Sequence, residues 1–186
     1  MSSSRPKSKQ RTIVFDTETT GLLLHPHAPL ERQPRIINFG AILLDNGKVV
    51  GEESFLINPE QELSAEITKI TGYVTADVAT QPVFVELLPR IIAAFKGCDL
   101  MIAHNLSFDR GMLTNDLRRC FNVNEFPWPP KSLCTVELYR EHFGHRPNLK
   151  KLYQHVTGKP LAQAHRALDD VKALVEIVQK DNLWKL

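Results

Sequence analysis

The turn at residues 45–47, whose sequence is Asp-Asn-Gly, constrains the fold of this chain more than any other segment. An Asn-Gly pair accepts the positive φ angles of a tight hairpin turn, and apolar segments at 35–44 and 48–57 flank it. A short β-branched and aromatic run at 12–15 predicts an earlier strand. We therefore expect the chain to begin with three strands, of which the second and third are antiparallel.

The rest of the chain is mainly helical in pattern, with polar caps, prolines and glycines that mark the ends of helices. Helices are expected between Ser64 and Gly72, at 83–95, from a cap at Ser107 to about 120, at 136–143, at 149–156 and from about 167 to the C-terminus. Two short strands, at 99–104 and 133–135, lie between them. Strands followed by helix–strand–helix units predict an α/β domain with a mixed sheet flanked by helices.

The first residues differ in composition from the rest. They are rich in Ser, Lys and Arg with no apolar residue after Met1, which predicts a disordered basic tail over 1–11. A weak electrostatic arm for nucleic acid is the alternative reading of this tail. Residues 12–186 then form a single domain, since this length suits one hydrophobic core.

Charge and cysteine content restrict the class of protein. The formal net charge of +2 excludes a histone-like polycation but permits a local basic groove. Three cysteines without C-x-x-C spacing argue against a disulfide framework or a zinc knuckle. No apolar run is long enough to span a bilayer, and the N-terminus lacks the apolar core of a secretory signal. We therefore expect a soluble cytoplasmic protein with no membrane segment.

Two carboxylates follow the first predicted strand, in the segment DTETTG at 16–21. Asp16 and Glu18 lie two residues apart, so they point to the same face of a strand. Carboxylates at this spacing repel each other unless a cation lies between them, and oxygen ligands are those that Mg²⁺ and Mn²⁺ prefer. The alternative is a strand end with two solvated acids.

A third carboxylate, Asp109, lies in the segment HNLSFD at 104–109, in the first turn of a predicted helix. Its ordinary role there would be a favourable charge at the positive end of the helix dipole. At roughly 100° per residue, however, Asp109 falls inside the apolar stripe of that helix. A carboxylate directed at the core needs a partner, and no basic residue shares its face nearby.

The segment HRALDD at 165–170 supplies a histidine and two aspartates at the start of the last helix. The apolar stripe of that helix predicts Asp169 on the solvent face and Asp170 at the flank of the buried face, so we nominate Asp170. His165 precedes the helix. A lone histidine is usually a polar surface residue, but five residues before Asp170 it becomes a candidate general base.

Together the three segments supply four carboxylates and one histidine at strand and helix ends. This inventory fits two divalent ions about 3.5–4 Å apart that clamp the attacking and leaving oxygens of a phosphodiester. Histidine, with an unperturbed pKa of about 6.5, would take the proton from a metal-bound water at neutral pH.

The segments DTETTG, HNLSFD and HRALDD resemble, in order and spacing, the three exonuclease motifs of the DEDDh family of 3′–5′ exonucleases. Within that family, the sequence is most similar to the proofreading epsilon subunit of bacterial DNA polymerase III and its free-standing relatives. The resemblance runs from about Thr12 to Val178 and includes the segments at 34–37 and 70–72. It implies a ribonuclease H-like fold, which agrees with the predicted order of strands and helices.

The resemblance also implies the metal ligands and the base. The ligands would be Asp16, Glu18, Asp109 and Asp170. They would hold two Mg²⁺ ions, for which Mn²⁺ would substitute, with Asp16 bridging the two. His165 would be the general base that activates the water.

Substrate contacts follow from the same resemblance. The residues implied are Thr17, Thr19, Leu22, His104, Asn105 and Phe108. The first three would hold the terminal nucleotide, with its 3′-hydroxyl near Glu18, while His104 and Asn105 would lie beside the last phosphates. Phe108 would support the pocket. Core packing is the alternative role of Leu22 and Phe108.

Several features depart from the family pattern. Asn38 stands where many members have Glu, although this position is not a ligand. The loop at 25–34 is long and rich in proline, and forms part of the substrate entrance or is simply mobile. The chain ends soon after the third segment, so we expect no stable polymerase tether through a C-terminal extension. Residues 182–186 resemble a sliding-clamp peptide, although an amphipathic helix end explains Leu183 and Trp184 equally well.

The sequence therefore predicts an exonuclease domain that removes nucleoside 5′-monophosphates from DNA 3′ ends. A 3′–5′ exoribonuclease is the alternative, since relatives trim RNA with the same residues and nothing in the motifs reads the 2′-hydroxyl. An inactive module that captures nucleic-acid 3′ ends is a third reading, but such a module has no need of His165.

Overall fold

The computed structural model describes residues 10–161 and 166–186. One mixed sheet has the strand order β3-β2-β1-β4-β5. The strands are Arg11–Thr19 (β1), Ile36–Asp45 (β2), Lys48–Leu56 (β3), Leu100–Ala103 (β4) and Lys131–Cys134 (β5). β2 is antiparallel to both β1 and β3, whereas β4 is parallel to both β1 and β5. The predicted α/β class with a mixed sheet is confirmed.

The hairpin between β2 and β3 forms where the sequence predicts it. Asn46 and Gly47 have φ angles of 49° and 80°, the left-handed pair that a tight two-residue turn needs. Trp184 covers this turn so closely that a Cβ on Gly47 would lie 2.5 Å from the indole nitrogen. Glycine is therefore required here both by the backbone angle and by the neighbouring ring.

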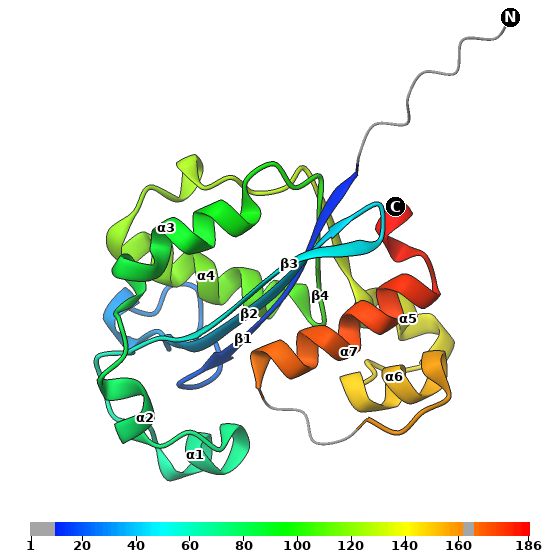
Figure 1. Ribbon diagram of the computed structural model, residues 1–186. Helices are drawn as coiled ribbons and strands as arrows, with labels where there is room; N and C mark the ends of the chain where they lie inside the picture. Colours follow the sequence, from blue (N-terminus) through cyan, green and yellow to red (C-terminus); the bar gives the residue numbers. More distant parts are fainter. Residues whose placement is uncertain (1–9, 162–165) are drawn as a thin grey trace, which may run out of the picture.

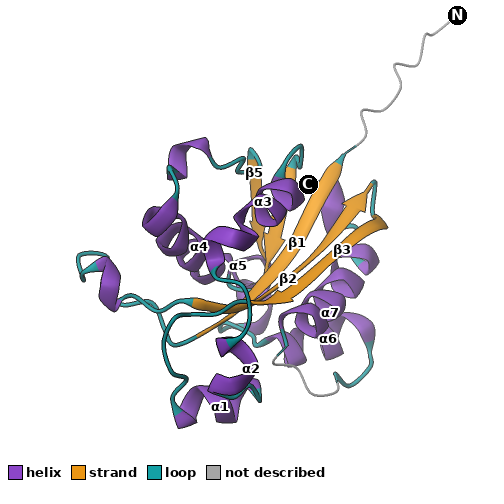
Figure 2. Ribbon diagram, turned by 60° about the vertical axis from the view of Figure 1, so that its left-hand side comes forward, coloured by secondary structure: helices purple, strands orange, loops and turns teal. Residues whose placement is uncertain are grey.

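Helices cover both faces of the sheet (Figures 1 and 2). In the described residues they are Ala65–Thr71 (α1), Thr75–Ala79 (α2), Phe84–Phe95 (α3), Leu106–Cys120 (α4), Thr135–Phe143 (α5), Leu149–Thr157 (α6) and Ala167–Lys180 (α7). Alternate side chains of β1 enter two cores. Phe15 packs with α3 and α4, and Val14 packs with α6 and α7 on the other face. Figure 1 shows α1 and α2 beyond the C-terminal end of β1.

Several boundaries differ from the sequence-based expectation. β1 continues to Thr19, so Asp16 and Glu18 lie within the strand rather than after it. The short helix α2 was not predicted, because its length is too small for a helical period to show. Ser107 was wrongly expected to cap α4. Asn105, with a φ of 74°, takes the position before the helix, and Ser107 lies in its first turn.

The two ends of the chain also differ from expectation. α7 ends at Lys180, and Asn182, with a φ of 55°, turns the chain into a short 3₁₀ turn at Leu183–Lys185. The expected continuation of the last helix to the C-terminus was therefore wrong. Most of the tail predicted at 1–11 lies outside the described residues, and Arg11 already belongs to β1. None of the described helices has the length and apolar character needed to cross a membrane.

Candidate active site

Three carboxylates converge near the C-terminal end of β1. Asp16 and Glu18 have the same parity as Val14 along the strand, so they face the side that α7 covers. Asp170 comes from the first turn of α7. One oxygen of each carboxylate lies within 4.8 Å of an oxygen of the other two. The structure therefore brings together three of the four predicted metal ligands.

The position of α7 follows from two residues of β2. Gly40 pairs with Asp16 across the β1–β2 ladder, and a Cβ on Gly40 would lie 2.6 Å from the backbone of Ala167. The first turn of α7 can cross the sheet here only because this side chain is absent. Asn38 Oδ1 accepts a hydrogen bond from Ala167 N at 3.0 Å, and Asn38 Nδ2 donates to Phe55 O at 2.9 Å. The residue that departs from the family pattern thus ties the start of α7 to the sheet.

The two aspartates of the third segment separate as the helical projection predicts. Asp169 is exposed, whereas Oδ1 of Asp170 is buried. Consecutive helical residues differ by roughly 100° in direction, which is enough to place one at the sheet and the other in solvent. His165, the predicted base, lies outside the described residues.

Aromatic and polar contacts hold the residues that follow His165. The Arg166 guanidinium lies over the Tyr73 ring, 5.8 Å from its centre. The Tyr73 hydroxyl in turn donates to Asn38 Oδ1 at 3.5 Å. Sequence reasoning missed this group because its members come from three separate segments. A pairing of Arg with an aromatic residue carries no local signal in the sequence.

Asp109, the fourth predicted ligand, is not part of the group of three. It lies on α4, whose core contacts are on the other face of β1 from α7. The side chain is 2% exposed, and its Oδ1 accepts hydrogen bonds from Thr17 N at 3.0 Å and Thr17 Oγ1 at 2.8 Å. The partner that the sequence lacked is therefore a strand amide and hydroxyl rather than a basic side chain.

Burial and mutual repulsion raise the pKa values of these carboxyls. For Asp16 burial is the larger cause, and repulsion from Asp109, Glu18 and Asp170 raises its pKa further, well above the ordinary value. Burial followed by repulsion from Asp170 and Asp109 raises the pKa of Glu18 to about 7. Burial also raises the pKa of Asp109 to about 7, although the bonds from Thr17 oppose the shift.

The donor set fits a divalent cation. In residues 10–161 and 166–186, no lysine or arginine forms an ion pair with Asp16 or Glu18. Buried carboxylates that repel one another lower the stability of a fold unless positive charge compensates them. Oxygen donors from several carboxylates are the ligands that Mg²⁺ and Mn²⁺ prefer.

The predicted contacts to the terminal nucleotide fall into two kinds. Thr17 and Thr19 are buried, and their hydroxyls donate within the protein, to Asp109 and, at 2.7 Å, to Gly21 O. Leu22, by contrast, is 79% exposed. This exposure excludes the alternative in which Leu22 only packs in the core.

His104 and Asn105 join the second segment to the loop before α6. His104 Nδ1 lies 3.0 Å from Thr135 Oγ1, and burial lowers the pKa of the ring to about 4, opposed by a hydrogen bond to the backbone of Pro147. Asn105 Oδ1 accepts from Arg146 Nη2 at 2.6 Å. Sequence reasoning missed Arg146, which lies 41 residues from Asn105 and carries no motif. It places a cation beside the turn that begins α4.

Phe108 occupies a middle position between the core and the surface. It is partly buried and packs against the cluster of apolar residues shared by α3, α4 and β1. Its neighbour Asp109 is the buried acid described above. Phe108 therefore supports the helix turn that carries this acid.

Comparisons with known proteins agree with this arrangement. The family model RNase_T, described as an exonuclease, matches residues 13–178. A PolC-type DNA polymerase III of Clostridium perfringens is 32% identical over 171 residues, which make up 90% of this chain and 11% of that protein. The DNA polymerase III subunit epsilon of Treponema pallidum is 29% identical over 168 residues, or 88% of this chain and 73% of that subunit.

Solved structures show the same likeness. Exonuclease X in complex with 5′-overhanging duplex DNA has a TM-score of 0.62 and 26% identity, over 92% of this chain and 93% of that chain. The nuclease domain of 3′hExo, a DEDDh family member bound to rAMP, shares the fold with a TM-score of 0.74 and 17% identity, over 96% of this chain and 94% of that one. The predicted ribonuclease H-like fold is therefore confirmed.

The chain spans a quarter or less of the length of several curated relatives, so the matches concern one domain of those larger proteins. Within that domain, the family model extends over nearly all of the sheet and both layers of helices. The exonuclease family that the three segments indicated is confirmed, and the chain belongs to it.

Proposed function

We propose that this protein is a metal-dependent 3′–5′ exonuclease that releases nucleoside 5′-monophosphates from DNA 3′ ends. The observation that carries the proposal is the group of Asp16, Glu18 and Asp170, whose oxygens lie within 4.8 Å of one another. Such a group lowers the stability of the metal-free fold, so its presence requires a reason other than packing. Membership of the exonuclease family supplies the reaction class.

Asp16, Glu18, Asp109 and Asp170 would hold two Mg²⁺ ions, for which Mn²⁺ would substitute. When bound, such ions neutralise the charge that develops on the phosphate and lower the pKa of a bound water. The protein positions these ligands through its own contacts. Asn38 holds the start of α7 and therefore Asp170, and Thr17 holds Asp109.

The nucleotide subsites follow from the exposure of the surrounding side chains. The terminal nucleotide is proposed to lie against Leu22, with its 3′-hydroxyl near Glu18. Thr17 and Thr19 would shape this subsite through the strand backbone, since their hydroxyls are engaged within the protein. Asn105 would lie beside the last phosphates, where Arg146 adds positive charge. His104 and Phe108 would support that turn from inside.

DNA is the proposed substrate because several matched relatives act in DNA synthesis by name and because Exonuclease X was solved with DNA. The competing function is a 3′–5′ exoribonuclease using the same ligands. We also propose that residues 12–186 form a single domain that works in the cytoplasm. The free state of Cys98, Cys120 and Cys134 supports a reducing compartment.

One assay tests the proposed function. The protein is incubated with matched DNA and RNA oligonucleotides labelled at the 5′ end, with Mg²⁺, with Mn²⁺ or with chelator. We expect stepwise shortening from the 3′ end, mononucleotide products and faster cleavage of DNA, all abolished by chelator. Binding of 3′ ends without any metal-dependent product would identify an inactive capture module instead. Faster cleavage of RNA would favour the exoribonuclease.

The proposed base has its own test. His165→Ala should reduce turnover by about 10²–10⁴-fold, because a general base typically contributes this much. Metal affinity and 3′-end affinity should stay near wild type. The remaining rate should rise more steeply with pH than the wild-type rate, because hydroxide replaces the missing base. Rate profiles of identical shape across pH for the two proteins would remove His165 from the mechanism.

A further inference from the structure

Helix α7, which carries Asp170, begins without a cap from the residue that precedes it. That residue is Arg166, whose backbone is extended and whose side chain makes no capping hydrogen bond. The first amides of an α-helix have no acceptor within the helix, so they need one from elsewhere. For Ala167 N the acceptor is Asn38 Oδ1 at 3.0 Å, from a residue 129 positions earlier in the chain. Asparagine is among the preferred capping residues, and here a strand, β2, supplies it.

The orientation of the Asn38 side chain is fixed from both ends of its amide. The residue is 3% exposed. Its Nδ2 donates to Phe55 O, which can only accept, and its Oδ1 faces Ala167 N, which can only donate. The amide therefore cannot turn over without the loss of both bonds. Asn38 also pairs with Glu18 across the β1–β2 ladder, so the cap lies beside a carboxylate of the candidate site.

Tyr73 connects this cap to a part of the molecule outside the sheet. It lies between α1 and α2, the two short helices beyond the C-terminal end of β1 (Figure 1). Its hydroxyl donates to Asn38 Oδ1 at 3.5 Å. The centre of its ring lies 5.8 Å from the Arg166 guanidinium. One side chain therefore contacts both the capping residue and the residue immediately before α7, and it restrains the start of this helix from two directions.

The place of the Asp170 carboxylate depends on how α7 starts. Asp170 belongs to the same first turn as Ala167, so a shift or rotation of that turn moves the carboxylate relative to the two acids of β1. Gly40 allows the turn to approach the sheet, because a Cβ there would lie 2.6 Å from the Ala167 backbone. Close approach alone does not fix the rotation of a helix about its axis. The hydrogen bond from Ala167 N to Asn38 has a direction, and it therefore supplies this restraint.

We propose that Asn38 and Tyr73 are positioning residues that set where the carboxylate of Asp170 lies. Asn38 caps α7 from β2, and Tyr73 keeps this cap in place. Neither side chain is itself a metal ligand. The inference rests on the proposed function, since it assigns the contacts that orient one of the proposed ligands. It also makes the segment between α1 and α2 part of the support of the metal site.

The test measures Mn²⁺ affinity without nucleic acid, from the electron paramagnetic resonance signal of free Mn²⁺. Asn38→Leu removes the acceptor at a similar side-chain size. Tyr73→Phe keeps the ring beside Arg166 and removes only the hydroxyl. The double variant N38L/Y73F shows whether the two side chains act through the same contact. In chelator, urea denaturation measures the stability of each protein, and hydrogen exchange followed by NMR reports on the Ala167 amide.

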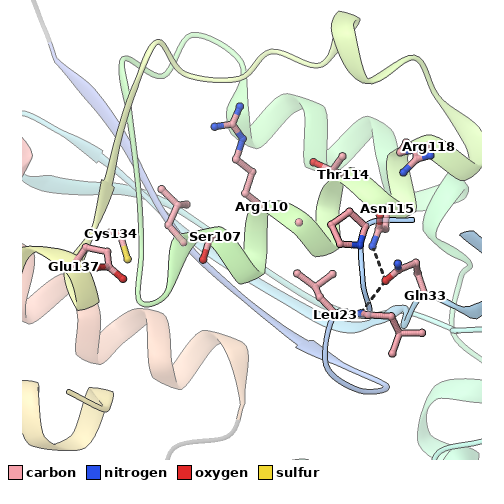
Figure 3. A pocket seen from close by; sticks show the side chains of 13 residues that line it. Leu23, Gln33, Ser107, Arg110, Thr114, Asn115, Arg118, Cys134 and Glu137 are labelled. Carbon is pink, nitrogen blue, oxygen red and sulfur yellow. Dashed lines mark hydrogen bonds between the residues drawn. The ribbon is translucent and has the colours of Figure 1, made fainter. Parts of the chain in front are cut away.

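Two matched controls remove the same kinds of group elsewhere. Gln33 is a second buried amide, 5% exposed, whose Oε1 accepts from Leu24 N at 3.1 Å and from Asn115 Nδ2 of α4 at 3.4 Å (Figure 3). Gln33→Met is the control for Asn38→Leu. Tyr153→Phe is the control for Tyr73→Phe, because the Tyr153 hydroxyl donates to Glu176 Oε2 of α7 at 2.8 Å. Asn115 and Glu176 each lie about 9 Å along their helix from its proposed metal ligand.

Asn38→Leu should bind Mn²⁺ about 10–100-fold more weakly than wild type, the usual effect of losing a contact that orients a ligand. Tyr73→Phe should lose about threefold, the effect of one weak hydrogen bond, and N38L/Y73F should bind like Asn38→Leu alone. The Ala167 amide should exchange faster in all three variants. Gln33→Met and Tyr153→Phe should be less stable than wild type but keep its Mn²⁺ affinity and its Ala167 exchange rate.

Wild-type Mn²⁺ affinity in folded Asn38→Leu would overturn the proposal, as would an equal loss in the controls or additive losses in N38L/Y73F. If Asn38→Leu does not fold, Tyr73→Phe decides, and an affinity equal to that of Tyr153→Phe would then overturn it. Failure of the proposed function would appear in the wild-type protein, as absence of Mn²⁺ binding or of mononucleotide release in Mg²⁺. Failure of this inference alone would leave both of those wild-type properties intact.

Discussion

Helix α4 buries two aspartates about two turns apart. They differ in whether a basic side chain pairs with the carboxylate. Asp109 and Asp116 are 2% and 3% exposed. Asp116 forms an ion pair with Arg119 and accepts a hydrogen bond from Ile36 N at 2.9 Å. Asp109 accepts bonds from Thr17, and the charged group that acts on its pKa is another carboxylate, Asp170.

The difference separates two uses of buried charge. Asp116 comes with its own cation, and together with Arg119 it fixes the loop before β2, so the pair serves the fold. Among the described residues, no lysine or arginine forms such a pair with Asp109, Asp16 or Glu18. A cation from solution would complete this second group. The two groups should therefore respond in opposite ways to the same kind of substitution.

The largest effect is expected at Asp16. Asp16→Asn should reduce turnover by at least about 10³-fold, because the transition state loses several kcal/mol of stabilisation by the metal charge. In chelator its free energy of unfolding should equal or exceed that of the wild type, since a repelling charge has been removed. Mononucleotide release and urea denaturation measure the two quantities. Near-normal turnover in Mg²⁺ would contradict the two-metal proposal.

The matched substitution at the paired aspartate should act in the opposite direction. Asp116→Ala should lower the free energy of unfolding by about 3–5 kcal/mol, because it leaves the mostly buried Arg119 without its carboxylate. The double variant D116A/R119M should recover part of this loss, since both charges are then absent. Urea denaturation in chelator measures all three proteins. A loss in Asp16→Asn as large as that in Asp116→Ala would remove the distinction between the groups.

A smaller effect is expected from pH in the metal-free protein. The raised pKa values of Glu18 and Asp109, both about 7, mean that the folded state holds more protons than the unfolded state between about pH 4.5 and 7. Stability should therefore be highest near the acid end of this window and fall by a few kcal/mol as pH rises through 7. Saturating Mg²⁺ should weaken or reverse the trend, because metal binding requires ionised ligands. Thermal melts across pH measure this, and a stability that rises with pH in chelator would contradict it.

The smallest effect is expected at Asp169. Asp169→Ala should change stability by no more than about 0.5 kcal/mol and leave turnover near wild type, because its side chain is exposed. Asp170→Ala is the comparison and should be inactive. If Asp169 proved essential and Asp170 dispensable, the assignment of the inward face of α7 would be wrong.

The sequence predicts those parts of the molecule that depend on local pattern. The Asn-Gly turn specifies the β2–β3 hairpin, and the helical period alone separates Asp169 from Asp170. The end of β1 was placed too early because Asp16 and Glu18 interrupt its apolar pattern. Polar residues at the end of a strand therefore resemble a loop when only the sequence is considered.

Contacts between distant segments could not be predicted in the same way. The partner of Asp109 is Thr17, 92 residues earlier, and threonine in a strand has no signal for this role. Asn38 appeared only as a departure from a family pattern, although it holds a backbone amide 129 residues away. Such contacts depend on how layers pack, and the periodicity of a single segment does not contain that information.

The close approach at Gly40 has a consequence for how motifs are interpreted. A single methyl group at this position would act as a spacer between the sheet and α7, since it would lie 2.6 Å from the backbone of Ala167. Both hydrophobic cores and every acidic residue of the three segments would be retained in such a variant. A comparison of sequences would find all three motifs intact in this variant. Its carboxylates would nevertheless no longer lie close together. In this protein, therefore, the motifs specify which carboxylates are present, and Gly40, which belongs to none of them, determines whether those carboxylates can lie side by side.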